Sequence, residues 1–257
     1  MAKKRLDVLL VERGLCTSRE QAQALILAGE VWTAESRLEK AGVKFDEALP
    51  LEVRTRTLPF VSRAGFKLQH ALDTFQVSVT DRVCIDVGAS TGGFTDCLLQ
   101  RGARHVFAID VGYGQLDSKL RRDPRVSSLE KVNARNLSKA DLVAASPLAQ
   151  EISFACIDVS FISLFKVIAP LRRQFPDLRD WVLLFKPQFE VGPEHVGKGG
   201  LVKDQNAIAI AVDEFHTFMT EQGLTRQGGP ESSPIAGKKS GNVELLLFYT
   251  DDRSTPR

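Results

Sequence analysis

The first candidate for chemistry is a glycine-rich segment that directly follows a short apolar run. It reads Asp86-Val-Gly-Ala-Ser-Thr-Gly-Gly-Phe-Thr-Asp96 and leads into a helix-like stretch that reaches Arg101. Glycines in such a loop let the backbone turn tightly and approach a ligand with no Cβ in the way. This strand–loop–helix pattern indicates a site for a nucleotide-like cofactor, in which Asp86 either lines the pocket or only braces the loop.

A second acidic residue supports this interpretation. Asp110 ends the apolar run 106–109 and lies 24 residues after Asp86, about the distance at which the second strand of such folds offers a carboxylate to a ribose diol. The loop lacks the Lys-Ser or Lys-Thr of a phosphate-binding loop and fits the dinucleotide pattern poorly. An adenosyl compound without phosphate is therefore favoured, and S-adenosylmethionine is the first choice. The alternative is a tight turn that binds nothing.

Four further charged residues end or interrupt apolar segments. Lys67 lies where a helix is expected to begin, Asp158 and Lys186 each close an apolar run, and Glu244 interrupts another. A charge in such a place is costly to bury unless it is paired. Two lysines and two acids could neutralise one another in one site, although each residue alone is as consistent with a solvated strand end.

Strand-like and helix-like segments alternate from about residue 80 onward. The expected strands are Val83–Val87, His105–Val111, Val126–Leu129, Ser153–Val159, Trp181–Phe185 and Val243–Tyr249. The expected helices are Thr95–Arg101, Leu116–Arg121, Leu164–Arg172 and Gln205–Gln222. This alternation predicts an α/β fold with a mostly parallel sheet covered on both faces. Ligands bind such sheets beyond the carboxyl ends of the strands, where Asp86, Asp110, Asp158 and Lys186 fall.

The first 60 residues predict a separate small module of two helices followed by short strands. Gly14 and Gly29 are expected to end the two helices, and Thr17-Ser-Arg-Glu20 has the form of a capping box at the start of the second. Short strands are expected near 31–33, 42–45 and 51–53. On these features alone the module could be any small α/β piece.

Composition sets limits on the class of protein. The chain has 257 residues and a formal net charge of only +2, so bulk charge does not indicate a nucleic-acid partner. Four cysteines without a C-x-x-C pair suggest reduced core residues of a cytoplasmic protein, and four histidines without ligand spacing predict no metal. No signal peptide is expected, and no apolar run approaches the roughly 18 residues of a membrane span. The sequence does not indicate an oligomeric state.

Local charge is more informative than the total. Residues 54–67 hold Arg54, Arg56, Arg63 and Lys67 with no acid, and residues 119–139 hold seven basic residues against two acids. Each stretch is either part of an RNA path or a solvated face. The glycine-rich segment 192–200 is either a lid or a plain surface loop.

Two resemblances sharpen these expectations. The pattern Arg5-Leu-Asp-Val-Leu-Leu, Gly14-Leu, Ser18-Arg19-Glu-Gln-Ala and Ile26-Leu-Ala-Gly29-Glu-Val31 resembles the alpha-L RNA-binding domain, named after ribosomal protein S-four. The resemblance implies that basic residues on one face, here Arg5 and Arg19 with Lys44 as a weaker candidate, hold structured RNA. Where family members usually read Val-x-Val-Asn-Gly at a hairpin, this chain reads Val31-Trp-Thr-Ala-Glu35. The alternatives are a solvated helix hairpin and a protein-binding module.

The second resemblance covers nearly the whole chain. Lys67, Asp158, Lys186 and Glu244 match the Lys-Asp-Lys-Glu tetrad of the FtsJ-like ribose 2′-O-methyltransferases, and the joined domains are similar to the TlyA (hemolysin A) family. This implies a small α+β alpha-L domain at 1–60, a Rossmann-like methyltransferase domain at 61–250 and a flexible tail at 251–257. The implied activity is S-adenosylmethionine-dependent 2′-O-methylation of cytidine in ribosomal RNA.

The resemblance also implies roles for individual residues. Lys186 would accept the proton of the ribose hydroxyl or stabilise the forming alkoxide, Asp158 would orient Lys186, and Lys67 with Glu244 would position the hydroxyl. The expected cofactor-binding residues are Asp86, Gly88, Ala89, Ser90, Thr91, Gly92, Phe94, Asp110, Val111, Gly112 and Asn133, with Gln115 as a weaker candidate; Asn133 could instead only cap a loop. The expected RNA-binding residues are Arg5, Arg19 and Arg63.

Three rival classes remain to be weighed. A methyltransferase for a base nitrogen would more typically carry an Asn-Pro-Pro-Tyr-like segment where this chain has Asp158-Val-Ser-Phe161. A membrane-active hemolysin is disfavoured because no segment is long or amphipathic enough to insert. A non-catalytic RNA-binding assembly factor is harder to exclude, and only the intact tetrad argues against it.

Overall fold

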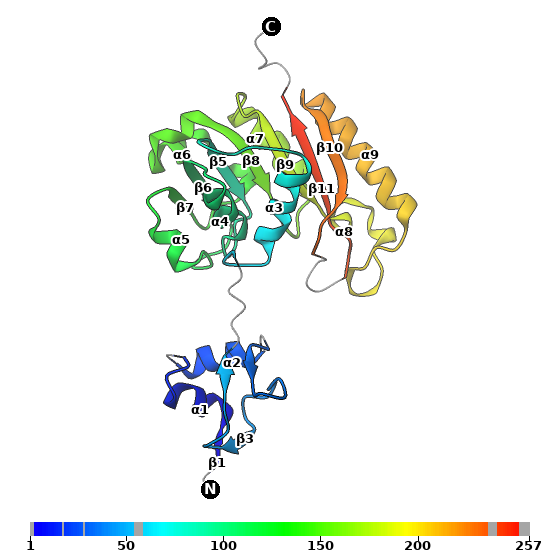
Figure 1. Ribbon diagram of the computed structural model, residues 1–257. Coiled ribbons are helices and arrows are strands. Elements are labelled where there is room, and N and C mark those ends of the chain that lie inside the picture. Colours follow the sequence, from blue (N-terminus) through cyan, green and yellow to red (C-terminus); the bar gives the residue numbers. More distant parts are fainter. Residues whose placement is uncertain (1–2, 17, 28, 54–58, 236–240, 252–257) are drawn as a thin grey trace. The chain divides into compact units, whose positions relative to one another are not determined.

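The computed structural model describes residues 3–16, 18–27, 29–53, 59–235 and 241–251 (Figure 1). The chain divides into two compact units, Met1–Pro59 and Phe60–Arg257. Each unit has its own apolar core, so each is described by itself. The predicted Arg54 and Arg56 of the first basic stretch lie outside the described residues.

The smaller unit consists of two short helices and four very short strands. These are β1 (Lys3–Arg5), α1 (Leu6–Glu12), α2 (Arg19–Leu27), β2 (Val31–Trp32), β3 (Lys44–Asp46) and β4 (Glu52–Val53). Strand β1 pairs with β3 and β2 with β4, both antiparallel. The helices bury their apolar sides against one another and the strands; the buried side chains include Leu6, Leu10, Ala22, Ile26 and Val31.

Local signals set the ends of these helices. Gly14 and Gly29 have φ of +68° and +74°, the left-handed conformation in which glycine commonly ends a helix. Thr17 of the expected capping box lies outside the described residues, and the Ser18 hydroxyl accepts a hydrogen bond from the backbone N–H of Gln21 at 3.2 Å. A turn follows β2 in spite of its unusual sequence, because the Thr33 N–H donates to the Ser36 carbonyl at 2.8 Å.

The larger unit is built on a seven-stranded sheet in the order β10-β11-β9-β8-β5-β6-β7. Its strands are β5 (Val83–Val87), β6 (His105–Ile109), β7 (Val126–Leu129), β8 (Ile152–Ile157), β9 (Asp180–Phe185), β10 (Thr225–Ser232) and β11 (Leu245–Thr250). Strands β7, β6, β5, β8 and β9 are parallel, whereas β11 is antiparallel to both of its neighbours. The predicted α/β class with a mostly parallel sheet is confirmed.

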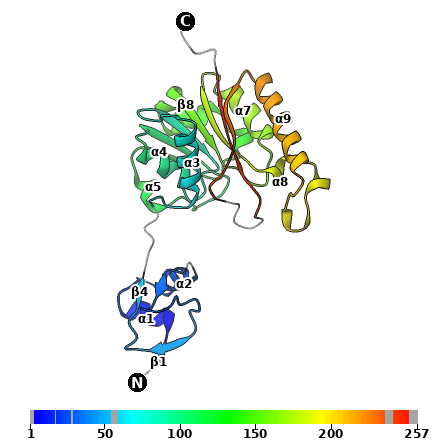
Figure 2. The same ribbon diagram turned by 45° about the vertical axis from the view of Figure 1, so that its right-hand side comes forward.

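Helices cover both faces of this sheet (Figures 1 and 2). One face carries α3 (Ala64–Thr74), α4 (Gly93–Gln100) and α5 (Ser118–Arg122), and the other carries α6 (Lys139–Ala145), α7 (Phe165–Gln174) and α9 (Gln205–Glu221). Short helical turns lie in the connections: α8 (Pro187–Glu190) and the 3₁₀ turns Ala134–Asn136, Pro147–Glu151, Pro193–His195 and Lys198–Gly200.

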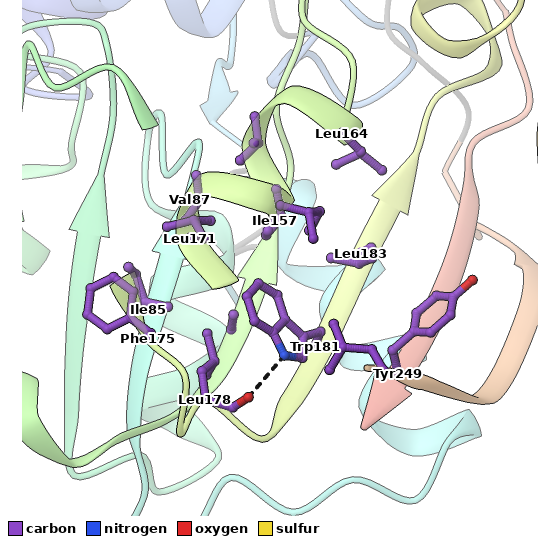
Figure 3. Close-up of a cluster of buried hydrophobic side chains, with 14 of the residues drawn as sticks. Ile85, Val87, Ile157, Leu164, Leu171, Phe175, Leu178, Trp181, Leu183 and Tyr249 are labelled. Atoms are coloured by element: carbon purple, nitrogen blue, oxygen red, sulfur yellow. Dashed lines mark hydrogen bonds between the residues drawn. The ribbon is translucent and has the colours of Figure 1, made fainter. Parts of the chain in front are cut away.

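Along most of these strands, successive side chains alternate between the two apolar layers; β8 shifts its register after Ile152. In β5, Val83, Ile85 and Val87 join the layer under α6, α7 and α9, while Cys84 joins the layer under α3 and α4. Figure 3 shows the first layer, in which Trp181 is completely buried and its indole N–H donates to the Leu178 carbonyl at 3.2 Å. Because both faces are covered, the central strands read as continuous apolar runs, which is why the sequence pattern located them.

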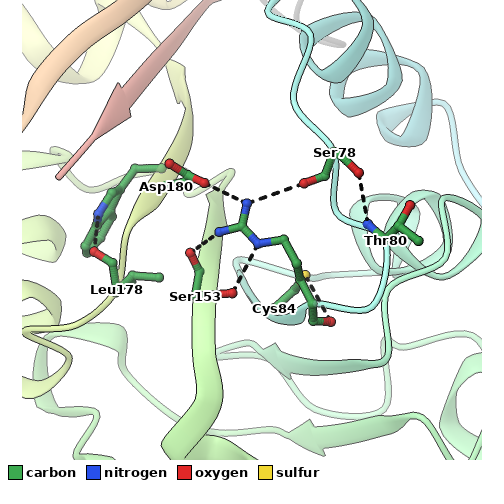
Figure 4. Close-up of polar contacts among 8 residues, drawn as sticks. Ser78, Thr80, Cys84, Ser153, Leu178 and Asp180 are labelled. Carbon is green, nitrogen blue, oxygen red and sulfur yellow. Dashed lines mark hydrogen bonds and ion pairs between the residues drawn. The ribbon is translucent and has the colours of Figure 1, made fainter. Parts of the chain in front are cut away.

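The amino ends of three strands are joined by one side chain. The Arg82 guanidinium, just before β5, donates to the Asp180 carboxylate at 2.6 Å and to the Ser153 hydroxyl at 3.1 Å, at the starts of β9 and β8 (Figure 4). It also donates to the Ser78 carbonyl at 3.4 Å. This network holds together the amino ends of β5, β8 and β9. The carboxyl ends of these strands, where ligands are expected, lie at the opposite side of the sheet.

The sequence analysis assigned residue 251 to a flexible tail, and this assignment is wrong for that residue. Asp251 is 3% exposed and pairs with the buried Arg172 guanidinium of α7. The same guanidinium donates to the carbonyls of Pro176, Leu178 and Gln222. Asp251 therefore anchors the end of β11, and the rest of the predicted tail lies outside the described residues.

Candidate active site

The glycine-rich loop joins β5 to α4 in a conformation that requires glycine. Gly88 and Gly92 have φ of +89° and +95°. A Cβ added at Gly88 would lie 2.4 Å from the Asp158 carbonyl oxygen, far inside van der Waals contact. The loop therefore packs directly on the backbone that carries Asp158, and the ends of β5 and β8 are held together.

Asp86 lies beneath this loop and supports it. Its carboxylate is completely buried and accepts a hydrogen bond from the Thr95 hydroxyl of α4 at 2.6 Å, while its second oxygen has no partner among the described residues. Burial raises the pKa of the Asp86 carboxyl to about 7. Of the two interpretations of Asp86, the structure favours the brace, because Asp86 lines neither of the cavities described next.

Asp110 holds the loop from the other side. Its two carboxylate oxygens accept hydrogen bonds from the backbone N–H groups of Ser90 at 2.8 Å and Gly112 at 2.6 Å. Each carboxylate oxygen can accept more than one hydrogen bond, so the carboxylate can also receive a ligand hydroxyl. Asp110 thus fixes both loops at the carboxyl ends of β5 and β6 while facing a cavity.

The larger cavity at this edge has a volume of about 760 Å³, within the size range of small-molecule and cofactor sites. Five of the predicted cofactor residues line it: Gly88, Ser90, Asp110, Val111 and Asn133. Gln115, the weaker candidate, lines it too. Asn133 also caps a 3₁₀ turn, since its side-chain oxygen accepts a hydrogen bond from the Arg135 N–H at 3.1 Å, and its contact with an adenine stays a prediction.

A smaller cavity of about 320 Å³ adjoins the first and contains all four tetrad residues. The two cavities share Gly88, Ser90, Asp158 and Ser160 in their walls. The smaller one is also lined by three other predicted cofactor residues, Ala89, Thr91 and Phe94. A ligand in the large cavity can therefore present one end to the tetrad.

The tetrad residues lie in or next to four different elements and form two ion pairs. The Lys186 ammonium, just after β9, lies 2.6 Å from the Asp158 carboxylate, just after β8. Lys67 of α3 pairs with Glu244, which lies just before β11. The four side chains are 5–16% exposed. Pairing makes it possible to bury four charges in one pocket, as the sequence pattern led us to expect.

Ser160 is a site residue that the sequence reasoning missed. Its hydroxyl accepts a hydrogen bond from the Lys186 ammonium at 2.8 Å. An ammonium carries three N–H donors, and Asp158 and Ser160 are the partners of two of them among the described residues. These two contacts fix the direction of the Lys186 side chain.

Glu190 secures the loop that carries these groups. Its carboxylate accepts a hydrogen bond from the Leu164 backbone N–H at 2.8 Å, at the start of α7. Burial raises the pKa of the Glu190 carboxyl to about 7. Since Glu190 follows Lys186 by one turn of α8, it ties the loop from Asp158 to Leu164 to the segment that carries the lysine.

Other predicted residues lie elsewhere. Gly92 and Gly112 line neither cavity; a Cβ at Gly92 would collide with the Leu120 side chain, so this glycine serves packing. Phe161 was not predicted, yet it lines the larger cavity, is 91% exposed and has φ of +64°, a conformation that costs an aromatic residue energy. No feature of residue type or spacing in the sequence points to Phe161.

The predicted RNA-binding residues fall in both units. Arg63 lines the smaller cavity beside Lys67. Arg5 and Arg19 lie in the smaller unit, where both guanidiniums contact the carboxylate of Asp7. In the basic stretch 119–139, Arg121 pairs with Glu130 and Arg125 pairs with Asp123. These two pairs reduce the positive charge that the stretch can offer to RNA.

Among the helices of the described segments, none is long and apolar enough to cross a membrane. In the same part of the chain, no group of three or more His, Cys, Asp or Glu side chains is arranged to hold a metal ion.

The fold and the site together define the class of the larger unit. A seven-stranded sheet with one antiparallel strand, carrying a cofactor-sized cavity at the carboxyl ends of β5 and β6, is the architecture of a Rossmann-like methyltransferase domain. Residues 60–249 match the FtsJ-like methyltransferase family, and residues 4–46 match the S4 domain. The chain belongs to the FtsJ-like methyltransferases and carries an S4 domain in its smaller unit, which confirms both resemblances.

Related proteins share both units. YqxC of Bacillus subtilis, assigned as an rRNA methyltransferase, is 48% identical over 245 residues, which are 95% of this chain and 85% of YqxC. TlyA of Mycobacterium tuberculosis, a 16S/23S rRNA (cytidine-2′-O)-methyltransferase, is 43% identical over 96% of this chain and 90% of its own. A solved structure from Streptococcus thermophilus, of a protein assigned as a hemolysin, is 39% identical, with a TM-score of 0.71 over 98% of this chain and 89% of that one.

Proposed function

We propose that this methyltransferase transfers a methyl group from S-adenosylmethionine to the 2′-hydroxyl of a cytidine in ribosomal RNA. The observation that carries the proposal is the meeting of Lys67, Asp158, Lys186 and Glu244 in one small cavity that opens into a cofactor-sized one. The names of the relatives TlyA and YqxC support the same substrate class.

The larger cavity suits an adenosyl compound. Asp110 can accept hydrogen bonds from a ribose diol, and the backbone of the loop from Gly88 to Thr91 leaves room for the methionine half. No Lys-Ser or Lys-Thr follows the glycines, so the loop lacks the residues that hold a phosphate. S-adenosylmethionine supplies an already activated methyl group, so the main task of the protein is alignment.

The residues of the small cavity can manage the proton of the attacking hydroxyl. A ribose 2′-hydroxyl is a weak nucleophile and must lose its proton as it attacks. Lys186 is held by Asp158 and Ser160 and either receives this proton or stabilises the developing alkoxide. Lys67 and Glu244 pair with each other in the same cavity and position the hydroxyl.

The RNA substrate follows from the same chemistry. Only RNA offers a 2′-hydroxyl, so a site built for that group discriminates against DNA. The S4 domain and the basic residue Arg63 at the mouth of the small cavity suit a phosphate backbone. Ribosomal RNA or ribosomal subunits are thus the proposed partners, and the cytoplasm is the proposed location.

The test is transfer of labelled methyl from S-adenosylmethionine to isolated small and large ribosomal subunits and to free ribosomal RNA. Wild type is compared with Lys186→Ala and with Lys203→Ala, a control that removes an exposed lysine outside both cavities. We expect label on a cytidine ribose with wild type and the control, and none with Lys186→Ala. Calorimetry should show unchanged cofactor binding by Lys186→Ala, because this lysine does not line the larger cavity.

The second candidate is a non-catalytic RNA-binding assembly factor, which the separate S4 domain favours. It predicts RNA binding and cofactor binding without methyl transfer to any of the three substrates. If Lys186→Ala kept near-full activity, the methyltransferase function would stand, and the role proposed for Lys186 would be refuted.

A further inference from the structure

Among the described residues of the smaller unit, one carboxylate is completely buried. Asp7, in the first turn of α1, is 0% exposed. It accepts two hydrogen bonds from the Arg5 guanidinium, both at 3.0 Å, one from Arg19 at 3.0 Å and one from the Gln23 amide at 3.1 Å. The hydrogen bonds from Arg5, above all, hold the pKa of the Asp7 carboxyl well below its usual range.

The two arginines reach Asp7 from different elements and remain accessible. Arg5 ends β1 and Arg19 begins α2, and their side chains are 44% and 54% exposed. A guanidinium has five N–H donors. Within the described residues, Asp7 engages two donors of Arg5 and one of Arg19, so several donors of each are left to face solvent.

A third cation lies beside them. Lys44 of β3 is directly opposite Arg5 of β1 in the antiparallel pair, and directly opposite residues share a face of the sheet. Lys44 is exposed and forms no ion pair with a described residue. The face formed by Arg5, Arg19 and Lys44 therefore has a net positive charge, although the unit as a whole is nearly neutral.

Stability alone does not explain a buried acid under two exposed arginines. Burying an ion pair usually gains little over an apolar side chain of similar size, because both charges must be desolvated. The arrangement instead fixes the direction in which the Arg5 and Arg19 side chains point. Two long side chains, which would otherwise sample many rotamers, are held by one anchor with their planar donor groups fixed.

We propose that Asp7 is a positioning residue that holds Arg5 and Arg19 as a single clamp for one phosphate group of the RNA backbone. Planar guanidiniums match phosphate oxygens in a bidentate geometry that a lysine does not reproduce. Fixing them in advance removes the cost of ordering two flexible side chains when RNA binds. The proposal deepens the proposed function, since it states how the smaller unit grips that RNA.

The decisive variant is Asp7→Asn, because the two possible roles of Asp7 predict opposite signs. If Asp7 only neutralises charge, its removal raises the net charge by one and RNA binds more tightly. If Asp7 positions the clamp, binding weakens by about tenfold, the cost of ordering two freed side chains. The probe is labelled total ribosomal RNA in a filter-binding assay with the full-length protein, repeated over a range of salt concentrations.

Glu12→Gln is the matched control, because it also removes one negative charge from the same unit. Glu12 pairs with Lys4 and does not contact Asp7, Arg5 or Arg19. We expect Glu12→Gln to bind RNA as tightly as wild type or slightly more tightly. Thermal unfolding followed by circular dichroism reveals any loss of the fold in either variant.

Arg19→Lys keeps the test decisive if Asp7→Asn fails to fold. It preserves net charge and removes only the planar fork, so we expect several-fold weaker binding with the same salt dependence. Unchanged or tighter binding by Asp7→Asn, or unchanged binding by Arg19→Lys, would overturn the clamp.

The clamp and the proposed function can fail separately. Wild type that transfers methyl to ribosomal RNA while Asp7→Asn binds that RNA undiminished refutes the clamp alone. Wild type that transfers no methyl while Asp7→Asn loses RNA binding refutes the activity alone. In the active enzyme, the clamp predicts a higher KM for RNA in Asp7→Asn with kcat little changed.

Discussion

Substitution of Gly88 by alanine tests whether the glycine-rich loop positions the proposed catalytic residues. The added Cβ would lie 2.4 Å from the Asp158 carbonyl oxygen and 2.9 Å from its carbon, both backbone atoms that cannot rotate away. The positive φ of +89° costs roughly 1–2 kcal/mol for a residue with a Cβ, and the overlap costs a further ~1–3 kcal/mol. We therefore expect Gly88→Ala to lower the free energy of unfolding by about 3 kcal/mol.

The same displacement should also reduce the rate of methyl transfer. Relief of the overlap requires the Asp158 backbone to move away, and Asp158 is the ion-pair partner of Lys186. A shift of about 1 Å in a reacting group can lower the rate about a hundredfold. Methyl transfer to ribosomal RNA at saturating cofactor measures this loss, and urea denaturation measures the stability.

Gly199→Ala is the control that separates the backbone strain of a positive φ from the steric overlap of an added Cβ. Gly199 has φ of +76° in the same unit, but a Cβ there would meet nothing within 4 Å. This control should lose only the roughly 1–2 kcal/mol of strain and keep its kcat. The reasoning is refuted if Gly88→Ala is no less stable than Gly199→Ala and retains full activity.

Three other predictions concern single contacts. Ser160→Ala removes a hydrogen-bond acceptor from the Lys186 ammonium and should lower kcat about tenfold, with the KM for cofactor unchanged and Ser160→Thr restoring activity. Asp86→Asn should weaken the pH dependence of unfolding: burial raises the pKa of this carboxyl to about 7, so wild type loses stability as pH rises from the unfolded value of 3.8 through 7, and the variant does not lose that contribution. Arg172→Leu removes the buried ion pair between Arg172 and Asp251 and should cost about 3–5 kcal/mol in urea denaturation.

Each of these predictions has an outcome that contradicts it. For Ser160→Ala, it is an unchanged kcat, or a loss that Ser160→Thr does not restore. For Asp86→Asn, it is the same difference in unfolding free energy between pH 5 and pH 8 as in wild type. For Arg172→Leu, it is a variant of near-wild-type stability, which would mean that the strand end is held by other contacts.

The sequence predicted the central sheet well for a physical reason. Strands buried on both faces must be apolar throughout, so β5, β6, β8 and β9 stand out as continuous runs. Strand β10 was missed because it reads Thr225-Arg-Gln-Gly-Gly-Pro-Glu-Ser232, with the glycines and proline that weaken strand propensity. It lies at the edge of the sheet, where proline is tolerated.

The candidate site likewise contains some residues that the sequence could predict and others that it could not. Charged residues that end apolar runs, such as Lys186 and Asp158, are conspicuous in sequence because such charges need a reason to be there. Ser160 and Asp7 were not predicted as site residues, because a serine in a loop and an acid in the first turn of a helix are ordinary. Their roles depend on what they contact in three dimensions, and spacing along the chain does not encode that.

The ion pair between Lys67 and Glu244 joins residues 177 positions apart in the chain. One partner comes from α3 and the other from the segment just before β11, so two walls of the proposed catalytic pocket are joined by a contact of very long range. Closing such a contact costs more chain entropy than closing a local one, and the pocket is complete only when both segments have come together. A folding intermediate that has formed only the parallel strands would have a cofactor loop and no working pocket. Recovery of activity after dilution from denaturant should therefore follow the slowest step of folding, and the enzyme should have no partly folded form that is active.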